Sequence, residues 1–278
     1  LLDRVRSLYD EQPSINDAPD AVEDFDTGGD IVLDDVTFSY SEDQPLFEGL
    51  DMTFRGGQIS AIVGATGSGK TTILSLLSRL YDVKGGQITI GGQPIEEIGR
   101  AALSRKVQPI FQDPFSSLNP RKTIRQVIEA PLKHLHGMDK AARDKRISEI
   151  FASVNLREEF LERYPHEFSG GQAQRIGIAR ALAADARILI LDEPVSALDV
   201  SVQAQVLNLL ERLKDELGLT YLFISHDLTV VQAITDRVLV MQKGRIVEEG
   251  PTRAVFEAPR HAYTQALLAA APRLVEDA

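Results

Sequence analysis

The sequence contains no cysteine, which excludes disulfide bonds, thiolate catalysis and metal sites ligated by cysteine. It also lacks an apolar run of about eighteen residues, so no segment is typical of a membrane-spanning helix or a signal peptide. Positively charged residues are in the minority, because the sequence has 30 Lys and Arg but 41 Asp and Glu, which gives a formal net charge of -11. This balance argues against a broad nucleic-acid-binding surface. We therefore expect a protein of a reducing compartment that binds no nucleic acid and reaches a membrane through a partner or through a segment missing from this sequence.

The remaining composition is that of a globular protein with an ample core, since 43% of the 278 residues are hydrophobic and 26% are charged. This length allows one large domain or two modest ones. The first residue is Leu1 rather than methionine, so we expect a fragment or a trimmed chain.

Alternation of apolar patterns along the chain predicts an α/β sheet with a helical insertion. Short alternating runs over residues 30–54 are typical of antiparallel strands, and "QISAIVG", "ARILILD" and "TYLFIS" are typical of buried strands. "RVLVMQKGRIVEEG" predicts a hairpin that turns at Lys243 and Gly244. We predict a helix and linker over 1–29, a core over 30–112 and 184–250, a helical subdomain over 113–183 and a C-terminal helical extension over 251–278.

Helical spacing of apolar residues predicts three amphipathic helices. The third of them is closed by Gly218. The apolar faces consist of Ile73, Leu76, Leu77 and Leu80 in the first, of Ile147, Ile150, Phe151 and Val154 in the second, and of Val206, Leu209, Leu210, Leu213 and Leu217 in the third.

The stretch "GATGSGKT" fits the pattern G-x-x-x-x-G-K-[ST] between a buried strand and an amphipathic helix. Backbone N–H groups of residues 65–71 can turn inward around a phosphate, Lys70 can bind the β- and γ-phosphates, and Thr71 can offer a hydroxyl to Mg²⁺. A glycine-rich turn that matches by chance is the alternative, and the strand–loop–helix context argues against it. The predicted nucleoside-triphosphate site comprises Gly64, Ala65, Thr66, Gly67, Ser68, Gly69, Lys70, Thr71 and Thr72.

The stretch "ILILDEP" predicts a buried strand with Asp192 at its carboxyl end, where α/β sheets bind ligands. Asp192 can hold Mg²⁺, and Glu193 can accept a proton from the attacking water. The alternative is that Asp192 or Glu193 merely caps the next helix before Pro194.

A second helix start, "FSGGQAQRIGIARAL", opens on Ser169, Gly170, Gly171 and Gln172 although glycine is a poor helix former. A helix start fronted by glycines is a second anion site, because the glycine N–H groups can approach a phosphate closely. One ATP does not need two such sites in one domain, so we predict that this one binds the γ-phosphate of a nucleotide held by another subunit. The alternative is a strained turn within an insertion.

Together with "ILILDEPVSALD", this stretch resembles the signature and magnesium strand of the ATP-binding cassette (ABC) family over residues 30–250. The resemblance implies a RecA-like P-loop NTPase core with an antiparallel β portion and an inserted helical subdomain. It also implies ATP and Mg²⁺ as ligands, ATP hydrolysis, and a head-to-tail dimer of two such domains.

Four further roles come from this resemblance. Tyr40 resembles the aromatic residue that stacks on adenine, although Val36, Phe38 and Tyr40 share one strand face and could all be core. Gln112 resembles the glutamine that reaches Mg²⁺ and the attacking water. Asp199 and His226 resemble, respectively, the residue that communicates across the dimer and the histidine that contacts the γ-phosphate. The alternative for His226 is a turn residue after a strand.

Two parts of the sequence resemble different members of the family. "PIFQDPFSSLNPRKTIRQVIEAPL" and "HAYTQALLAAAPRL" are similar to the ATPase subunits of dipeptide and oligopeptide importers. "LLDRVRSLYDEQPSI", "IVLDDVTFSY" and "GATGSGKTT" are closer to the ATPase half of an exporter. Importer subunits usually carry Glu-Ser where this chain has Ala65 and Thr66, and often a cysteine cluster that this chain lacks.

We give most weight to the helical subdomain, because in this family it faces the membrane subunits. It predicts the ATPase of a peptide importer, peripheral on the cytoplasmic side of the cell membrane and bound to integral membrane permease subunits. The alternatives are an exporter domain cut from a longer or mosaic chain, and a non-transport ABC ATPase of DNA repair or ribosomes.

Overall fold

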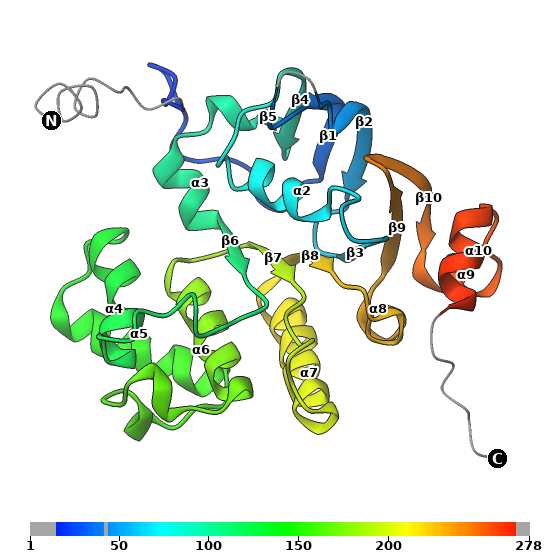
Figure 1. The fold of residues 1–278 in the computed structure, drawn as a ribbon. Coiled ribbons are helices and arrows are strands. Elements are labelled where there is room, and N and C mark those ends of the chain that lie inside the picture. The colour runs from blue at the N-terminus through cyan, green and yellow to red at the C-terminus, as the bar shows by residue number, and fades with distance from the viewer. Residues whose placement is uncertain (1–14, 42–43, 271–278) are drawn as a thin grey trace, which may run out of the picture.

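The computed structural model describes residues 15–41 and 44–270, so the helix predicted at the start of the chain lies outside the described residues. Two sheets form the centre of the molecule, as Figure 1 shows. The larger sheet has the strand order β10-β9-β3-β8-β7-β6, in which only β10 is antiparallel to its neighbour. Its strands are β3 (Ile59–Val63), β6 (Val107–Ile110), β7 (Ile188–Asp192), β8 (Thr220–Ile224), β9 (Arg237–Gln242) and β10 (Arg245–Pro251).

Alternate residues of the buried parallel strands divide between two hydrophobic cores, because successive side chains of a strand point to opposite faces. Ile190 of β7 and Leu222 of β8 belong to the core beneath the smaller sheet, whereas Leu191 and Phe223 belong to the core on the other side. Both faces of the sheet are therefore covered, which explains the nearly continuous apolar runs of these strands.

The smaller sheet is antiparallel, with the order β2-β1-β4-β5, and confirms the predicted β portion. Two short helices lie between it and the larger sheet in Figure 1 and share its core. The strands are β1 (Ile31–Phe38), β2 (Phe47–Phe54), β4 (Gly85–Ile90) and β5 (Gln93–Pro94), and the helices are α2 (Lys70–Leu77) and α3 (Arg100–Lys106).

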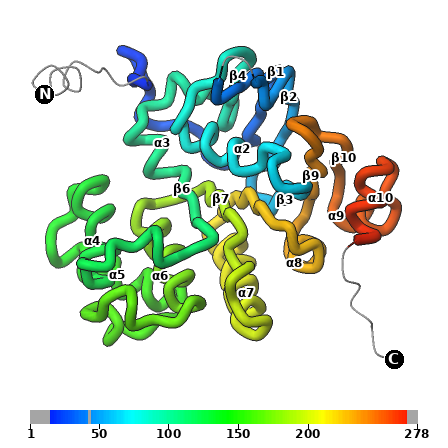
Figure 2. The backbone as a smooth tube through the Cα atoms, viewed as in Figure 1, coloured from blue at the N-terminus to red at the C-terminus, as the bar shows by residue number. Residues whose placement is uncertain are grey.

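The opposite face of the larger sheet is covered by α7 (Val200–Leu217) and α8 (Leu228–Ile234), which share its core with three helices of the insertion. These three, α4 (Ile124–His134), α5 (Lys140–Ser153) and α6 (Gly170–Ala183), pack on one another and confirm the predicted helical character of this part of the chain. The tube in Figure 2 shows them grouped on one side of α7, beyond β6.

The end of the described chain forms the predicted hairpin and two short helices. β9 and β10 are joined by Lys243 and Gly244, both with positive φ, as a tight hairpin turn requires. The helices α9 (Thr252–Glu257) and α10 (Ala262–Ala269) then pack beside β10, and Figure 1 shows them at the edge of the molecule.

Two expectations about local structure are corrected. The helix predicted to include Leu80 ends at Leu77, because Arg79 takes a positive φ of 48° and turns the chain, which leaves Leu80 59% exposed. Leu217 at the last turn of α7 is 40% exposed rather than part of a fully buried apolar face. The described part of the predicted linker, residues 15–29, packs against the domain, where Val22 exchanges backbone hydrogen bonds with Glu97 and Gly99 at 2.8 and 2.9 Å.

Within the described ranges, none of the helices combines the length and the apolar character that spanning a bilayer requires.

Candidate active site

The loop from Gly64 to Gly69 joins β3 to α2 and requires glycine at both ends. Gly64 has a φ of 154°, and a Cβ there would lie 2.1 Å from the carbonyl oxygen of Met241 on β9. Gly69 has a φ of 108°, and a Cβ would lie 2.6 Å from the ring of Phe47 on β2. The loop is therefore seated tightly between two strands, which no residue with a side chain would permit.

Lys70, the first residue of α2, folds its side chain back over this loop. Its Nζ donates to the carbonyl oxygens of Gly64 at 2.8 Å and Ala65 at 2.9 Å. Burial lowers the pKa of the Lys70 ammonium, while the carboxylates of Glu193 and Asp192 oppose that shift. A half-buried cation thus lies at the mouth of a loop of backbone N–H groups, which is an arrangement suited to binding phosphate.

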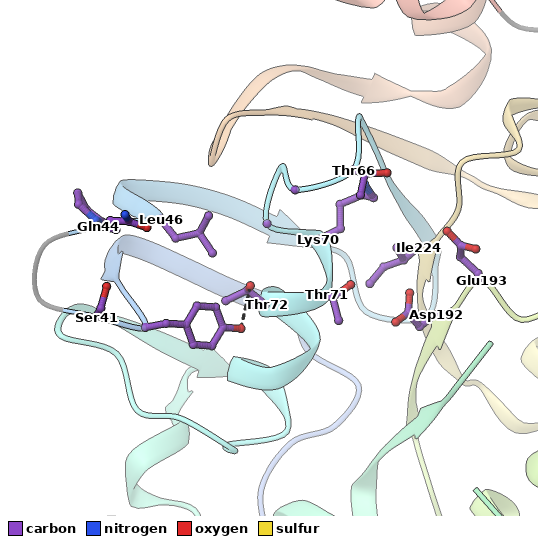
Figure 3. Close-up of a pocket in the computed structure, with 14 residues that line it drawn as sticks. Ser41, Gln44, Leu46, Thr66, Lys70, Thr71, Thr72, Asp192, Glu193 and Ile224 are labelled. Atoms are coloured by element: carbon purple, nitrogen blue, oxygen red, sulfur yellow. Dashed lines mark hydrogen bonds between the residues drawn. The ribbon is translucent and has the colours of Figure 1, made fainter. Parts of the chain in front are cut away.

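Asp192 and Glu193 lie at the carboxyl end of β7, opposite this loop, as Figure 3 shows. Burial raises the pKa of Asp192, the neighbouring Glu193 raises it further, and Lys70 opposes both. Glu193 has a positive φ of 49°, and its N–H donates to the carbonyl oxygen of Ile224 on β8 at 2.8 Å. The next helix is α7, whose N-cap is Asp199, so the alternative in which Asp192 or Glu193 caps a helix is wrong.

Two predicted residues adjoin Glu193 through hydrogen bonds. His226, just after β8, places Nδ1 2.9 Å from Oε1 of Glu193. Gln112, just after β6, donates from Nε2 to the hydroxyl of Ser196 at 3.2 Å, and that hydroxyl donates to the Glu193 carbonyl at 3.1 Å. The ends of β6, β7 and β8 therefore converge on one residue, with His226 at the carboxylate of Glu193 and Gln112 reaching its backbone carbonyl through Ser196.

Tyr40 follows β1 and faces α2 rather than the core. Its side chain is 59% exposed, and its hydroxyl lies 3.0 Å from the hydroxyl of Thr72, the contact dashed in Figure 3. The ring makes edge contacts with Phe38 and Tyr81, at centroid distances of 5.0 and 5.3 Å. Val36 and Phe38 are buried, so the alternative that all three residues form core is wrong for Tyr40.

Tyr40, the loop and the carboxylates line one pocket of about 480 Å³. The predicted residues that line it are Tyr40, Thr66, Gly67, Gly69, Lys70, Thr71, Thr72, Asp192 and Glu193, and the others are Ser41, Gln44, Pro45, Leu46 and Ile224.

The residues of the predicted second anion site are not among the described residues that line this pocket. Ser169 is the N-cap of α6 and forms a capping box with Gln172, whose Oε1 accepts from the Ser169 N–H at 3.1 Å. A Cβ on Gly171 would lie 2.2 Å from Val202 of α7. Neither Gly170 nor Gly171 has a positive φ, so the alternative of a strained turn is wrong. Asp199 is exposed at the start of α7, in the sequence between Leu198 and Val202, whose side chains lie against Gly170 and Gly171.

Sequence reasoning missed three features of the site. The spacing of Ser169 and Gln172 is that of a capping box, a signal visible in the sequence. The N–H of Ala65, expected to face a phosphate, donates instead to the hydroxyl of Tyr263 on α10 at 2.9 Å. The N–H of Gly244 donates to the Ser68 carbonyl at 3.0 Å. No local pattern reveals the last two contacts, because they join distant parts of the chain.

The donor set of this pocket fits a nucleoside triphosphate with Mg²⁺. The loop offers backbone N–H groups and the Lys70 cation to phosphates, and the exposed Tyr40 offers an aromatic face. The hydroxyl of Thr71 and the carboxylate of Asp192 line the pocket and are hard oxygen ligands, and the side-chain oxygen of Gln112, which is not among the described residues that line it, would be a third. Among the described residues there is no group of three or more His, Cys, Asp or Glu side chains that could hold a metal alone. A cation here would take its other ligands from phosphate and water, as Mg²⁺ commonly does.

Sequence comparison with known proteins identifies the family of the chain. Residues 47–196 match the profile described as ABC transporter, and residues 247–278 match that of the oligopeptide/dipeptide transporter C-terminal region. The chain is 48% identical over 229 residues to the oligopeptide transport ATP-binding protein AppF of Bacillus subtilis, a match that covers 81% of this chain and 70% of AppF. It is 47% identical over 233 residues to the dipeptide transport ATP-binding protein DppF of Escherichia coli, covering 83% and 70%.

Solved structures agree on the fold. A bacterial Atm1-family ABC exporter with ATP bound superposes with a TM-score of 0.79 at 26% identity, covering 96% of this chain and 46% of that one, so the chain spans about half of the exporter's length. CbiO1 of Clostridium perfringens, part of the ABC transporter complex cbiONQ, superposes with a TM-score of 0.75 at 27% identity, covering 82% and 90%. The chain belongs to the ATP-binding, ATP-hydrolysing subunits of the ABC transporter family.

Proposed function

We propose that this chain powers the uptake of oligopeptides or dipeptides, as a peripheral subunit on the cytoplasmic side of the membrane, bound to separate integral membrane permease subunits. The similarity to the oligopeptide transport protein AppF and the dipeptide transport protein DppF, at 48% and 47% identity, supports peptide transport. The match of residues 247–278 to the oligopeptide/dipeptide transporter C-terminal region supports it independently. The exporter alternative rests on a likeness of 26% identity and is therefore the weaker candidate.

One observation carries the catalytic part of the proposal. Lys70, Asp192 and Glu193 come from distant parts of the sequence, yet they line the same pocket. Lys70 would leave the carbonyls of Gly64 and Ala65 to bind the β- and γ-phosphates of ATP, and Tyr40 would stack on the adenine. Thr71, Gln112 and Asp192 would hold Mg²⁺, which, when bound, neutralises charge on the phosphate oxygens.

Glu193 is the proposed general base. It would accept a proton from the water that attacks the γ-phosphorus, as the bond from that phosphorus to the leaving oxygen of ADP breaks. His226 holds one carboxylate oxygen at 2.9 Å and leaves the other oxygen to face the water. Because the Glu193 N–H donates to the Ile224 carbonyl, the backbone that carries the carboxylate is held at the carboxyl end of β8.

The proposed working unit is a head-to-tail dimer of two such domains. Ser169, Gly170, Gly171 and Gln172 would face the γ-phosphate bound to the other chain, with Asp199 communicating across the interface. The separation of α6 from the pocket of its own chain supports this arrangement. In this scheme residues 30–112 and 184–250 form the ATP-binding core, 113–183 the helical subdomain and 251–278 the C-terminal extension.

The test is peptide uptake by cells in which this chain is the sole copy of the subunit. Cells carrying Lys70→Ala should lose uptake of a labelled di- or oligopeptide, while the chain should still co-purify with its membrane subunits after solubilisation. Normal uptake by the mutant would contradict the proposal. Co-purification with no membrane protein would contradict the assignment of its partners.

A further inference from the structure

One peptide unit of the phosphate loop, the unit joining Gly64 to Ala65, is hydrogen-bonded at both ends. Its carbonyl oxygen accepts from Lys70 Nζ at 2.8 Å, and its N–H donates to the Tyr263 hydroxyl at 2.9 Å. Because the trans peptide is planar, its C=O and N–H point in opposite directions, and fixing one fixes the other. Tyr263 therefore sets the direction of the carbonyl that binds the Lys70 ammonium, from 198 positions further along the sequence.

The hydroxyl of Tyr263 is held in place by the start of α10. Glu248 of β10 accepts from the backbone N–H groups of Arg260 at 2.8 Å and His261 at 3.0 Å. His261 is the N-cap of α10, and its Nδ1 accepts from the N–H of Tyr263 at 3.1 Å. The Tyr263 ring packs on the hydrophobic core. These contacts tie the tyrosine to the edge strand of the main sheet, independently of any ligand.

A second contact from the C-terminal part of the chain holds the same loop. The N–H of Gly244, in the β9–β10 hairpin, donates to the carbonyl oxygen of Ser68 at 3.0 Å. A loop with three glycines has much conformational freedom to lose when it binds phosphate. Contacts that restrict the loop beforehand reduce that loss, and so improve the affinity for the ligand.

We propose that Tyr263 is a positioning residue of the nucleotide site: through the Gly64–Ala65 peptide it orients the phosphate loop and, before a nucleotide binds, the ammonium of Lys70. The C-terminal segment is thereby coupled to nucleotide binding within one chain. The identity of the ligand rests on the proposed function, whereas the coupling of Tyr263 to the loop does not.

The experiment compares Tyr263→Phe with the wild type in the full chain. This substitution removes the hydroxyl and keeps the ring, so the melting temperature should change little. The affinities for ATP and ADP, measured by calorimetry, should both fall about 2- to 10-fold, the range expected for one hydrogen bond. Hydrogen exchange of the Ala65 amide, measured without nucleotide, should accelerate by a similar factor.

The matched control is Gln265→Ala, on the same helix. It removes the hydrogen bond from Gln265 Nε2 to the Pro259 carbonyl, at 3.0 Å, and leaves the Tyr263 hydroxyl in place. Nucleotide affinity and Ala65 exchange should match the wild type in this variant.

Two results would overturn the proposal: unchanged Ala65 exchange and affinity in Tyr263→Phe, or an equal loss in Gln265→Ala, which would indicate a general loosening of α10. A wild-type chain that binds neither ATP nor ADP would instead remove the proposed function. The exchange rate of Ala65 would then still decide whether Tyr263 holds the loop.

Discussion

Replacing Tyr40 with alanine tests whether its ring stacks on adenine or supports the core. Base–aromatic stacking contributes roughly 1–3 kcal/mol, so Tyr40→Ala should weaken ATP binding by about 5- to 150-fold. The free energy of unfolding should fall less than it does when a buried aromatic residue of the core is truncated. A tyrosine that is 59% exposed buries about 80 Å², worth about 2 kcal/mol, against roughly 3–5 kcal/mol for truncating a buried ring.

The assay pairs calorimetric titration with ATP and thermal unfolding of the same variants. Tyr40→Phe keeps the ring and loses only the hydroxyl contact with Thr72, so ATP affinity should stay within about threefold of the wild type. Tyr40→Trp should also be tolerated. The matched control is Tyr81→Ala, which removes a neighbouring exposed ring that is not among the described residues lining the pocket.

The control should lose stability much as Tyr40→Ala does, but little ATP affinity. If Tyr40→Ala binds ATP like the wild type and unfolds at a much lower temperature, then the ring supports the core and does not stack on adenine.

Three further predictions concern the cation, the second chain and the membrane partner. Because burial lowers the pKa of Lys70, nucleotide affinity measured by calorimetry should decline with rising pH from below the ordinary lysine value of 10.5, whereas Lys70→Arg should keep its charge and show no such decline. Ser169→Arg and Gly170→Asp should bind nucleotide as single chains but fail to dimerise in light scattering with ATP. A loss of nucleotide binding by the single chain would mean that this helix start binds the nucleotide of its own chain. Because the chain has no cysteine, Phe115→Cys gives a unique attachment point on an exposed surface of the helical subdomain, and cross-linking from it should capture a separate membrane subunit rather than a covalently linked domain or none.

The parts of the fold that were predictable from sequence are those governed by local patterns. The runs around Ile190 and Leu222 predicted buried strands because each strand contacts a core on both faces. Lys243 and Gly244 predicted a hairpin because both positions require positive φ. The phosphate loop was equally predictable, since its glycines and Lys70 lie within eight residues of one another.

The parts that were not predictable depend on contacts between distant residues. Leu80 keeps the helical spacing, yet the helix ends before it, because the Arg79 guanidinium is buried and bonded to the Ile98 carbonyl at 3.2 Å and Asp82 at 3.2 Å. Strand alternation could not predict that Tyr40 is exposed. The strand ends at Phe38, so the alternation of buried and exposed side chains does not extend to Tyr40. Tyr263 reaches the phosphate loop only through the packing of α10 on β10.

The most direct test of the account is the rate of phosphate release from ATP by Glu193→Gln, measured with Mg²⁺ alongside bound nucleotide. Glutamine keeps the size of the side chain and loses its basicity, so turnover should fall by about 10²–10⁴ while ATP stays bound. Lys70→Ala, run in parallel, should lose nucleotide binding as well as turnover. Near-normal phosphate release by Glu193→Gln would contradict the claim that this pocket hydrolyses ATP with Glu193 as its base.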